Sequence, residues 1–200
     1  MENEYEKQGI TFKIIPPEMI PDVCDFMWEH FVPDEPLLRS LGAKRSKFMD
    51  EGYFGEAMMD GTSMVALDKE GKILAVRLGM RKWKSKWLSW ILDRFMYNIP
   101  NWMLKLILPP DMTKSMPIVT KLFDMIEYNV WRMFEVCGCD LIYEDKAVCS
   151  ARSSGIRGLG TELCRRTESL AKELGCTHTY TLVTGKYYLQ VVPSKLTKII

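Results

Sequence analysis

A glycine-rich segment three-quarters of the way along the chain has the residue types and spacing that point most directly to chemistry. Gly155, Gly158 and Gly160 lie between a predicted strand and a predicted helix. Glycines let the backbone approach a ligand closely, and the first N–H groups of a helix have no partners within it. With the helix dipole, this arrangement suits a bound phosphate, to which Arg152 and Arg157 can add positive charge. A plain strand-to-helix turn, with glycines that serve only the backbone conformation, is the alternative interpretation.

The spacing of these glycines argues against two common nucleotide-binding motifs. A Walker A loop ends in Gly-Lys-Ser/Thr, but here Gly160 is followed by Thr161 and Glu162. A dinucleotide-binding fingerprint follows the first strand of a βαβ unit, whereas this loop follows a late strand. The segment therefore predicts a phosphate site of another kind.

Hydrophobic periodicity predicts the elements that must position this loop. Alternating or β-branched stretches predict strands at 10–15, 62–67, 73–82, 141–149 and 177–183. Helical spacing predicts helices at 20–31, 44–59, 119–134 and 161–174. The short loop from Asp68 to Gly71 favours a hairpin. This order predicts a mixed α/β domain with at least one crossover between parallel strands.

Length and composition narrow the class of protein. Two hundred residues predict a single domain over 1–200, within which we expect a Trp- and Met-rich insertion at 83–112. A net charge of +1 argues against a dedicated nucleic-acid binder. Polar residues interrupt the apolar stretch 87–108, so we predict no transmembrane segment. The chain starts without a signal-peptide pattern, and we therefore expect a cytoplasmic monomer with reduced cysteines.

The cysteines and histidines do not form a convincing metal motif. Cys137 and Cys139 form a Cys-x-Cys pair, but the sequence has no second cysteine pair and only two histidines, His30 and His178. We therefore expect no metal cofactor.

Three segments resemble a known family. The run from Ile156 to Thr161 resembles the second half of the acetyl-CoA motif, Arg/Gln-x-x-Gly-x-Gly/Ala, of the GCN5-related N-acetyltransferase superfamily. Phe31-Val-Pro-Asp-Glu-Pro-Leu and Phe134-Glu-Val-Cys-Gly-Cys-Asp are similar to segments of its insect arylalkylamine N-acetyltransferases. At the first position of the acetyl-CoA motif, Gly155 stands in place of Arg or Gln, and Arg152 lies three residues earlier.

The resemblance, which covers most of the chain, implies an acyl-CoA N-acyltransferase fold, a central mixed twisted sheet flanked by helices. It also implies transfer of an acetyl group from acetyl-CoA directly to a primary arylalkylamine such as dopamine, tyramine or serotonin. Glu35 matches the family's general base, with Asp34 as a second candidate in the same loop. Tyr188 is the candidate that protonates the leaving thiolate, and Tyr187 and Thr184 are other hydroxyls in that stretch.

The resemblance further implies that the oxyanion is stabilised by backbone N–H groups of the strand before the glycine loop. We expect Cys149 in this strand to pack and not to act as a nucleophile. The residues expected to bind acetyl-CoA are Ala147, Val148, Cys149, Arg152, Gly155, Ile156, Arg157, Gly158, Leu159, Gly160 and Thr161.

Two features leave a second interpretation open. Only 17 residues follow Val183, where the family builds a further helix and usually two strands, so 184–200 is expected to be an atypical short tail with these elements incomplete. The apolar segment 83–108 is expected to form a lid over the acceptor site, or alternatively to dock on a partner or a membrane surface. The alternative function is therefore a catalytically impaired or non-catalytic relative that binds acyl-CoA, a partner or a membrane.

Overall fold

The computed structural model describes residues 8–40, 42–84, 134–135 and 137–181. The chain divides into two compact units, Met1–Lys82 with Ile142–Ile200, and Trp83–Leu141. Most of the expected insertion and of the helix at 119–134, the tail from 184 and Tyr188 lie outside the described residues. Among the described residues, no helix is both long and apolar enough to cross a membrane.

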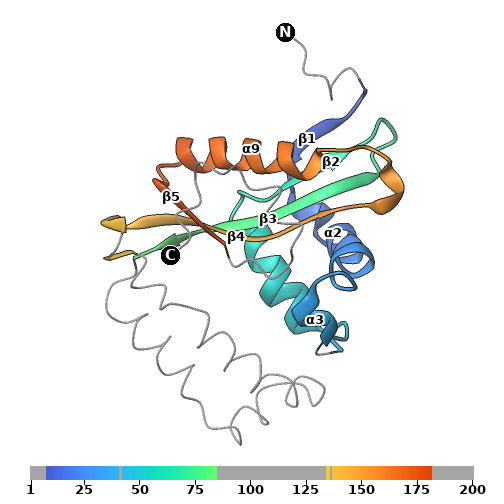
Figure 1. The fold of residues 1–200 in the computed structure, drawn as a ribbon, viewed down its shortest axis with the longest axis horizontal. Helices are drawn as coiled ribbons and strands as arrows, with labels where there is room; N and C mark the ends of the chain where they lie inside the picture. Colours follow the sequence, from blue (N-terminus) through green and yellow to red (C-terminus); the bar gives the residue numbers. More distant parts are fainter. Residues whose placement is uncertain (1–7, 41, 85–133, 136, 182–200) are drawn as a thin grey trace, which may run out of the picture. The chain divides into compact units, whose positions relative to one another are not determined.

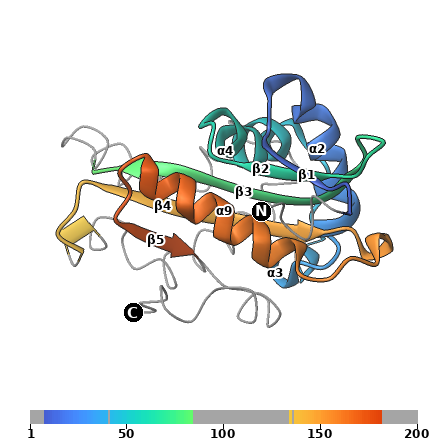
Figure 2. The ribbon, with the colours of Figure 1, turned by 90° about the horizontal axis from the view of Figure 1, so that it is seen from above.

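Within the described residues, five strands form one mixed sheet (Figures 1 and 2). The strands, which lie side by side in chain order, are β1 (Thr11–Ile14), β2 (Met64–Leu67), β3 (Ile73–Trp83), β4 (Leu141–Ser150) and β5 (His178–Thr181). Strands β1, β2 and β3 pair antiparallel, whereas β4 and β5 pair parallel. Helix α9 (Leu159–Glu173) connects the parallel pair. The predicted hairpin and parallel crossover are thus confirmed.

The helices before β2 follow the predicted pattern with two differences. α2 (Ile20–Phe26) continues as the π-helical segment η2 (Met27–Phe31), after the short turn η1 (Pro17–Met19). The expected helix at 44–59 begins only at η3 (Phe48–Gly55) and continues as α4 (Glu56–Met59). Residues 44–46 are not helical. The short helix α3 (Pro36–Ser40), which the sequence did not predict, precedes them, and the N–H of Ala43 donates to the carbonyl of its residue Leu38. Five residues are too few to show helical periodicity.

Helices cover the sheet from opposite sides, with α9 on one side and α2 and α3 on the other (Figure 1). Each side has its own apolar cluster. The larger cluster joins α2, η3 and α4 to the sheet and includes Val23, Met27, Phe54, Val76 and Leu78. The second joins α9 to β2 and β3 and includes Met64, Leu74, Leu159 and Leu163. The sheet therefore contributes side chains to two separate hydrophobic cores, one on each face.

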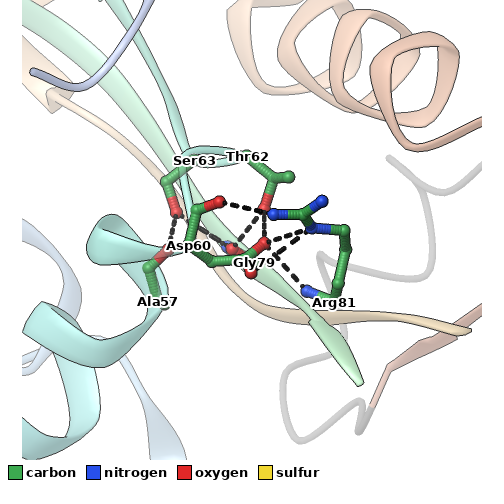
Figure 3. Close-up of polar contacts among 6 residues, drawn as sticks. All are labelled: Ala57, Asp60, Thr62, Ser63, Gly79 and Arg81. Carbon is green, nitrogen blue, oxygen red and sulfur yellow. Dashed lines mark hydrogen bonds and ion pairs between the residues drawn. The ribbon is translucent and has the colours of Figure 1, made fainter. Parts of the chain in front are cut away.

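A polar network holds the start of β2 against β3 (Figure 3). The hydroxyl of Ser63 donates to the carbonyl of Ala57 at 2.9 Å and accepts from the N–H of Gly79 at 3.1 Å. The hydroxyl of Thr62 donates to the carbonyl of Gly79 at 2.9 Å. Asp60 accepts from the backbone N–H of Arg81 at 3.0 Å. Buried hydroxyls in this turn are thereby satisfied, as burial requires.

Gly79 also allows β3 and β4 to approach each other closely. A Cβ at this position would lie 2.1 Å from the hydroxyl oxygen of Tyr143 and 2.9 Å from the carbonyl oxygen of Glu144. The Tyr143 ring therefore packs directly on the bare backbone of β3, which only glycine provides.

A buried ion pair joins β3 to β4. The side chains of Arg77 and Asp145 are 2% and 3% exposed, and two bonds link them, from Nη2 to Oδ2 at 2.7 Å and from Nε to Oδ1 at 3.1 Å. Glu168 of α9 lies 3.9 Å from the same guanidinium. Burial alone would lower the pKa of Arg77, but the Asp145 charge raises it above its usual value. The guanidinium thus remains charged in the core and ties both strands to α9.

Replacing one partner of this pair should destabilise the domain strongly. We expect Arg77→Met to lower the unfolding free energy by about 3–5 kcal/mol, because it leaves the Asp145 charge buried without compensation. The double variant Arg77→Met with Asp145→Leu should lose clearly less, since both charges are gone. Urea unfolding measures both values. Equal losses would show that the side-chain volumes, and not the paired charges, stabilise this region.

Candidate active site

Strand β4 contains one residue more than β3 over the length that they share. At one end the N–H of Lys84 donates to the carbonyl of Asp140 at 2.8 Å, and at the other the N–H of Ala151 donates to the carbonyl of Leu74 at 2.8 Å. Eleven residue steps separate Asp140 from Ala151, whereas ten separate Leu74 from Lys84. One extra residue opposite a regular strand is a β-bulge.

Side-chain directions place the bulge between Asp145 and Ala147. Asp145 faces α9 with Arg77 and Glu168, whereas Ala147 packs in the larger cluster on the opposite side of the sheet. Residues two apart in a regular strand share one face, so the extra residue lies here. The backbone groups predicted to form the oxyanion site, from Ala147 to Cys149, therefore begin at a break in regular pairing.

The loop after β4 has the backbone conformation that the glycines predict. Gly155 and Gly158 adopt φ values of +63° and +83°, the left-handed region that glycine occupies without strain. The backbone conformation therefore favours glycine at these two positions. Gly160, in contrast, lies inside α9 with ordinary helical geometry.

The first turn of α9 also has the open N–H groups that the phosphate interpretation needs. No side chain caps this helix, and the N–H of Glu162 makes the first helical bond, to the carbonyl of Gly158. The N–H groups of Leu159, Gly160 and Thr161 precede that bond and point out of the helix end. The glycine segment can therefore form the strand-to-helix turn and also offer N–H groups to a phosphate.

The acidic loop that follows η2 lies beside the glycine loop. The N–H groups of Asp34 and Glu35 both donate to the carbonyl of Phe31, at 3.0 and 2.9 Å. The carboxylate of Glu35 then accepts from the N–H of Leu38 in the first turn of α3. Asp34 forms an ion pair with Arg152 of η4 (Arg152–Ser154), the turn that follows β4. The structure thus brings two sequence-predicted site segments together through a contact that the sequence analysis did not foresee.

Cys149 is buried beside this ion pair. Its side chain belongs to the larger apolar cluster. Burial raises the pKa of the thiol to about 12, the nearby Asp34 charge adds to the rise, and Arg152 opposes it. A thiol held in its protonated form is a poor nucleophile. This supports the expectation that Cys149 packs and takes no covalent part.

A cavity of about 980 Å³ lies along α2, η3 and α4 and reaches β4 at Lys146. The ammonium of Lys146 pairs with Glu56 at 3.0 Å and lies 5.3 Å from the centre of the Tyr53 ring. Burial alone would raise the pKa of Glu56, but Lys146 lowers it, so the carboxylate stays ionised. Asp34 and Glu35 are absent from the described residues that line the cavity, which are Ile20, Pro21, Cys24, Arg45, Asp50, Glu51, Gly52, Tyr53, Gly55, Glu56, Met59 and Lys146. Sequence analysis missed this cavity because its walls come from distant segments.

Comparison with known proteins identifies the fold. No protein-family model and no curated protein sequence matches the chain. Among solved structures, arylalkylamine N-acetyltransferase 2 from Aedes aegypti is 21% identical with a TM-score of 0.74, covering 91% of this chain and 79% of that chain. A Drosophila melanogaster polyamine N-acetyltransferase is 15% identical with a TM-score of 0.67, covering 91% and 79%. An agmatine N-acetyltransferase is 16% identical with a TM-score of 0.68, covering 92% and 80%. The chain has the fold of the GCN5-related N-acetyltransferases.

A negative charge introduced into the glycine loop by substitution tests whether this loop binds phosphate. Gly158→Asp should abolish binding of coenzyme A, because a carboxylate would stand beside the open N–H groups of α9 and repel a phosphate. Gly71→Asp is the matched control, since Gly71 has a φ of +82° and open space around it in the β2–β3 turn. Both variants carry the same backbone strain. Calorimetry should show lost affinity in the first variant and wild-type affinity in the second; equal affinities would remove the phosphate assignment.

Glu162 in the first turn of α9 should make the unfolding free energy depend on pH. Hydrogen bonds from Arg165 and Arg166 hold the Glu162 carboxylate, and the bond from Arg165 is the main cause that lowers its pKa from 4.5 to about 2. A carboxyl with a lowered folded-state pKa stabilises the fold above 4.5 and loses this contribution as the pH falls toward 2. We expect a loss of about 1–2 kcal/mol across this window, allowing for solvent screening of the exposed Arg165. Urea unfolding of Glu162→Gln should lack this part of the acid destabilisation, and an unchanged slope would contradict the assignment.

Proposed function

We propose that this protein is an acetyl-CoA-dependent N-acetyltransferase whose acceptor is a primary arylalkylamine such as dopamine, tyramine or serotonin. The observation that carries the proposal is the β4 bulge followed by a left-handed glycine loop and an uncapped helix, in a chain with the GCN5-related fold. The names of the similar solved structures, an arylalkylamine and an agmatine N-acetyltransferase, support an amine as the acceptor.

The glycine loop suits the phosphate groups of acetyl-CoA. Open N–H groups at Leu159, Gly160 and Thr161 and the dipole of a 15-residue helix favour an anion at this point. Arg152 adds charge on the β4 side of the loop. Acetyl-CoA supplies the thioester carbonyl that the amine attacks. The C–S bond then breaks, and coenzyme A leaves as a thiolate that takes up a proton, for which Tyr188 is the proposed donor. The residues of the chain bind and orient acetyl-CoA and the amine, and they transfer protons.

The bulge in β4 supplies donors for the charge that develops on the carbonyl oxygen. Attack by the amine converts that carbonyl into an oxyanion, which preorganised backbone N–H groups stabilise. In the proposed arrangement the donors come from Ala147, Val148 and Cys149, at and after the bulge that interrupts the regular pairing of β4 with β3. The buried pair Arg77–Asp145 holds the strand immediately before these residues.

Glu35 is the proposed general base. An alkylamine has a pKa of roughly 10, so that nearly all of it is ammonium at neutral pH and must lose a proton before it attacks. The Glu35 carboxylate accepts one backbone bond from Leu38, and a carboxylate has further lone pairs for the ammonium, directly or through water. Asp34 adds negative charge in the same loop.

The cavity next to Lys146 is the proposed place for the apolar body of the acceptor. It adjoins β4 one residue before the proposed oxyanion donors, on the side of the sheet to which Ala147 also points. Its walls include Ile20, Tyr53 and Met59, which suit an aromatic ring. Its charged lining residues are paired: Lys146 with Glu56, Arg45 with Asp50, and Glu51 with Lys47.

Glu35→Gln tests the role of the base while preserving the cap of α3, because the amide oxygen can still accept from Leu38. We expect turnover of tyramine to fall by about 10²–10⁴, with coenzyme A binding intact. The loss should shrink at high pH, where free amine is already present. Glu29→Gln, an exposed carboxylate on the preceding helical segment, is the control and should keep full turnover. A pH–rate profile for Glu35→Gln that parallels the wild type would assign the base to another residue.

A further inference from the structure

We propose that Cys137 and Cys139 form a dithiol site that reacts with small-molecule disulfides and closes into an intramolecular disulfide. The site is separate from the proposed acetyl transfer, because neither cysteine is among the residues assigned to the cofactor or the amine. The basis of the proposal is the distance between the two sulfur atoms, which lie within 4.8 Å of each other on either side of Gly138.

A helix end brings the two thiols together. The helical residues before it include Glu135 and Cys137, and Gly138 follows with a φ of +61°. The N–H of Gly138 donates to the carbonyl of Glu135 at 3.3 Å, and the N–H of Cys139 donates to the carbonyl of Phe134 at 3.2 Å. Two such bonds around a left-handed glycine form a Schellman motif, which ends a helix. The chain turns at Gly138, and Cys137 and Cys139 lie on the two sides of this turn.

The geometry of this turn permits a disulfide between the two cysteines. Two residue steps of chain span at most about 7 Å, and disulfide-bonded residues have Cα atoms about 4.4–6.8 Å apart. The sulfur atoms already lie within 4.8 Å, so rotation of the two side chains is enough to bring them to bonding distance. Space beside the turn is also open, because a Cβ on Gly138 would meet no atom within 4 Å. A small molecule can therefore approach the pair.

Burial separates this pair from the other cysteines of the chain. Of the six cysteines, all of which the structure describes, the buried ones are Cys24, Cys149, Cys164 and Cys176. Burial raises the pKa of Cys24 to about 11 and the pKa values of Cys149 and Cys164 to about 12. Cys137 and Cys139 are partly exposed. Since a disulfide is attacked by a thiolate that can reach it, we expect the reaction only at the partly exposed pair.

Thiol–disulfide exchange is the reaction that two neighbouring thiols suit. The thiolate of one cysteine attacks a sulfur atom of the small disulfide, forms a mixed disulfide and expels one half of the reagent as a thiolate. The thiolate of the other cysteine then attacks the protein sulfur of the mixed disulfide and expels the second half. The two cysteines lose two protons and two electrons, and the small disulfide takes up both and becomes two thiols. The second step is intramolecular, because the attacking sulfur lies within 4.8 Å.

Incubation of the folded protein with oxidised glutathione in the presence of EDTA, followed by alkylation and mass spectrometry, tests the site. For the wild type we expect the loss of two hydrogen atoms and a peptide in which Cys137 and Cys139 are joined. Cys137→Ser and Cys139→Ser should instead each retain a bound glutathione, because no second thiol remains to displace it. The fraction of wild type that carries glutathione should be at most about a tenth of the fraction in either variant, since an intramolecular thiol outcompetes a dissolved one.

Cys164→Ala is the matched control, because it removes a buried thiol, and it should form the same disulfide as the wild type. Three results would overturn the proposal: a wild type that stays reduced, one that accumulates as much bound glutathione as the serine variants, or a disulfide that joins other cysteines. The experiment contains neither acetyl-CoA nor an amine. Any of these results would therefore leave the proposed function in place.

Discussion

The buried ion pair between Arg77 and Asp145 is the constraint on which the rest of the described structure depends. Two charges removed from water are tolerable only when each has a well-placed partner, and here two bonds of 2.7 and 3.1 Å provide it. The pair fixes the register of β3 against β4, and Glu168 extends it to α9. The strand and the helix that flank the glycine loop are thereby held by one charge cluster.

The register that this pair fixes has a direct consequence for chemistry. Because Asp145 is anchored toward α9 and Ala147 packs on the other side of the sheet, the extra residue of β4 must lie between them. Backbone N–H and C=O groups in the middle of a sheet normally form hydrogen bonds with the neighbouring strands. A bulge leaves some of these groups unpaired, so that a ligand can bind them. Gly79, which lets the Tyr143 ring lie on β3, keeps the two strands close beside it.

The two ion pairs at β4 differ in their burial. The buried pair behind β4 is nearly inaccessible to water, and loss of one partner would leave an unpaired charge in the core. The pair Asp34–Arg152 at the end of the same strand is exposed and worth little on its own. Burial thus separates an ion pair that is shielded from water from one that solvent screens. The similarity to solved N-acetyltransferases at 21% identity or below defines the fold, and the roles of the site residues are proposed from this chain's own contacts.

The sequence by itself determined the described strands, the helices α2 and α9 and the glycine loop. Alternation predicts β1 to β3 and their hairpin, helical spacing predicts α2 and α9, and Gly155 and Gly158 adopt the left-handed conformation that their residue type allows. Neighbouring residues decide these features, so a local pattern suffices. The tertiary structure alone decided which distant residues meet: Arg77 with Asp145 across 68 positions, Asp34 with Arg152 across 118, and the cavity walls around Lys146. Such contacts depend on strand register, and one inserted residue turns every following side chain to the other face of the sheet.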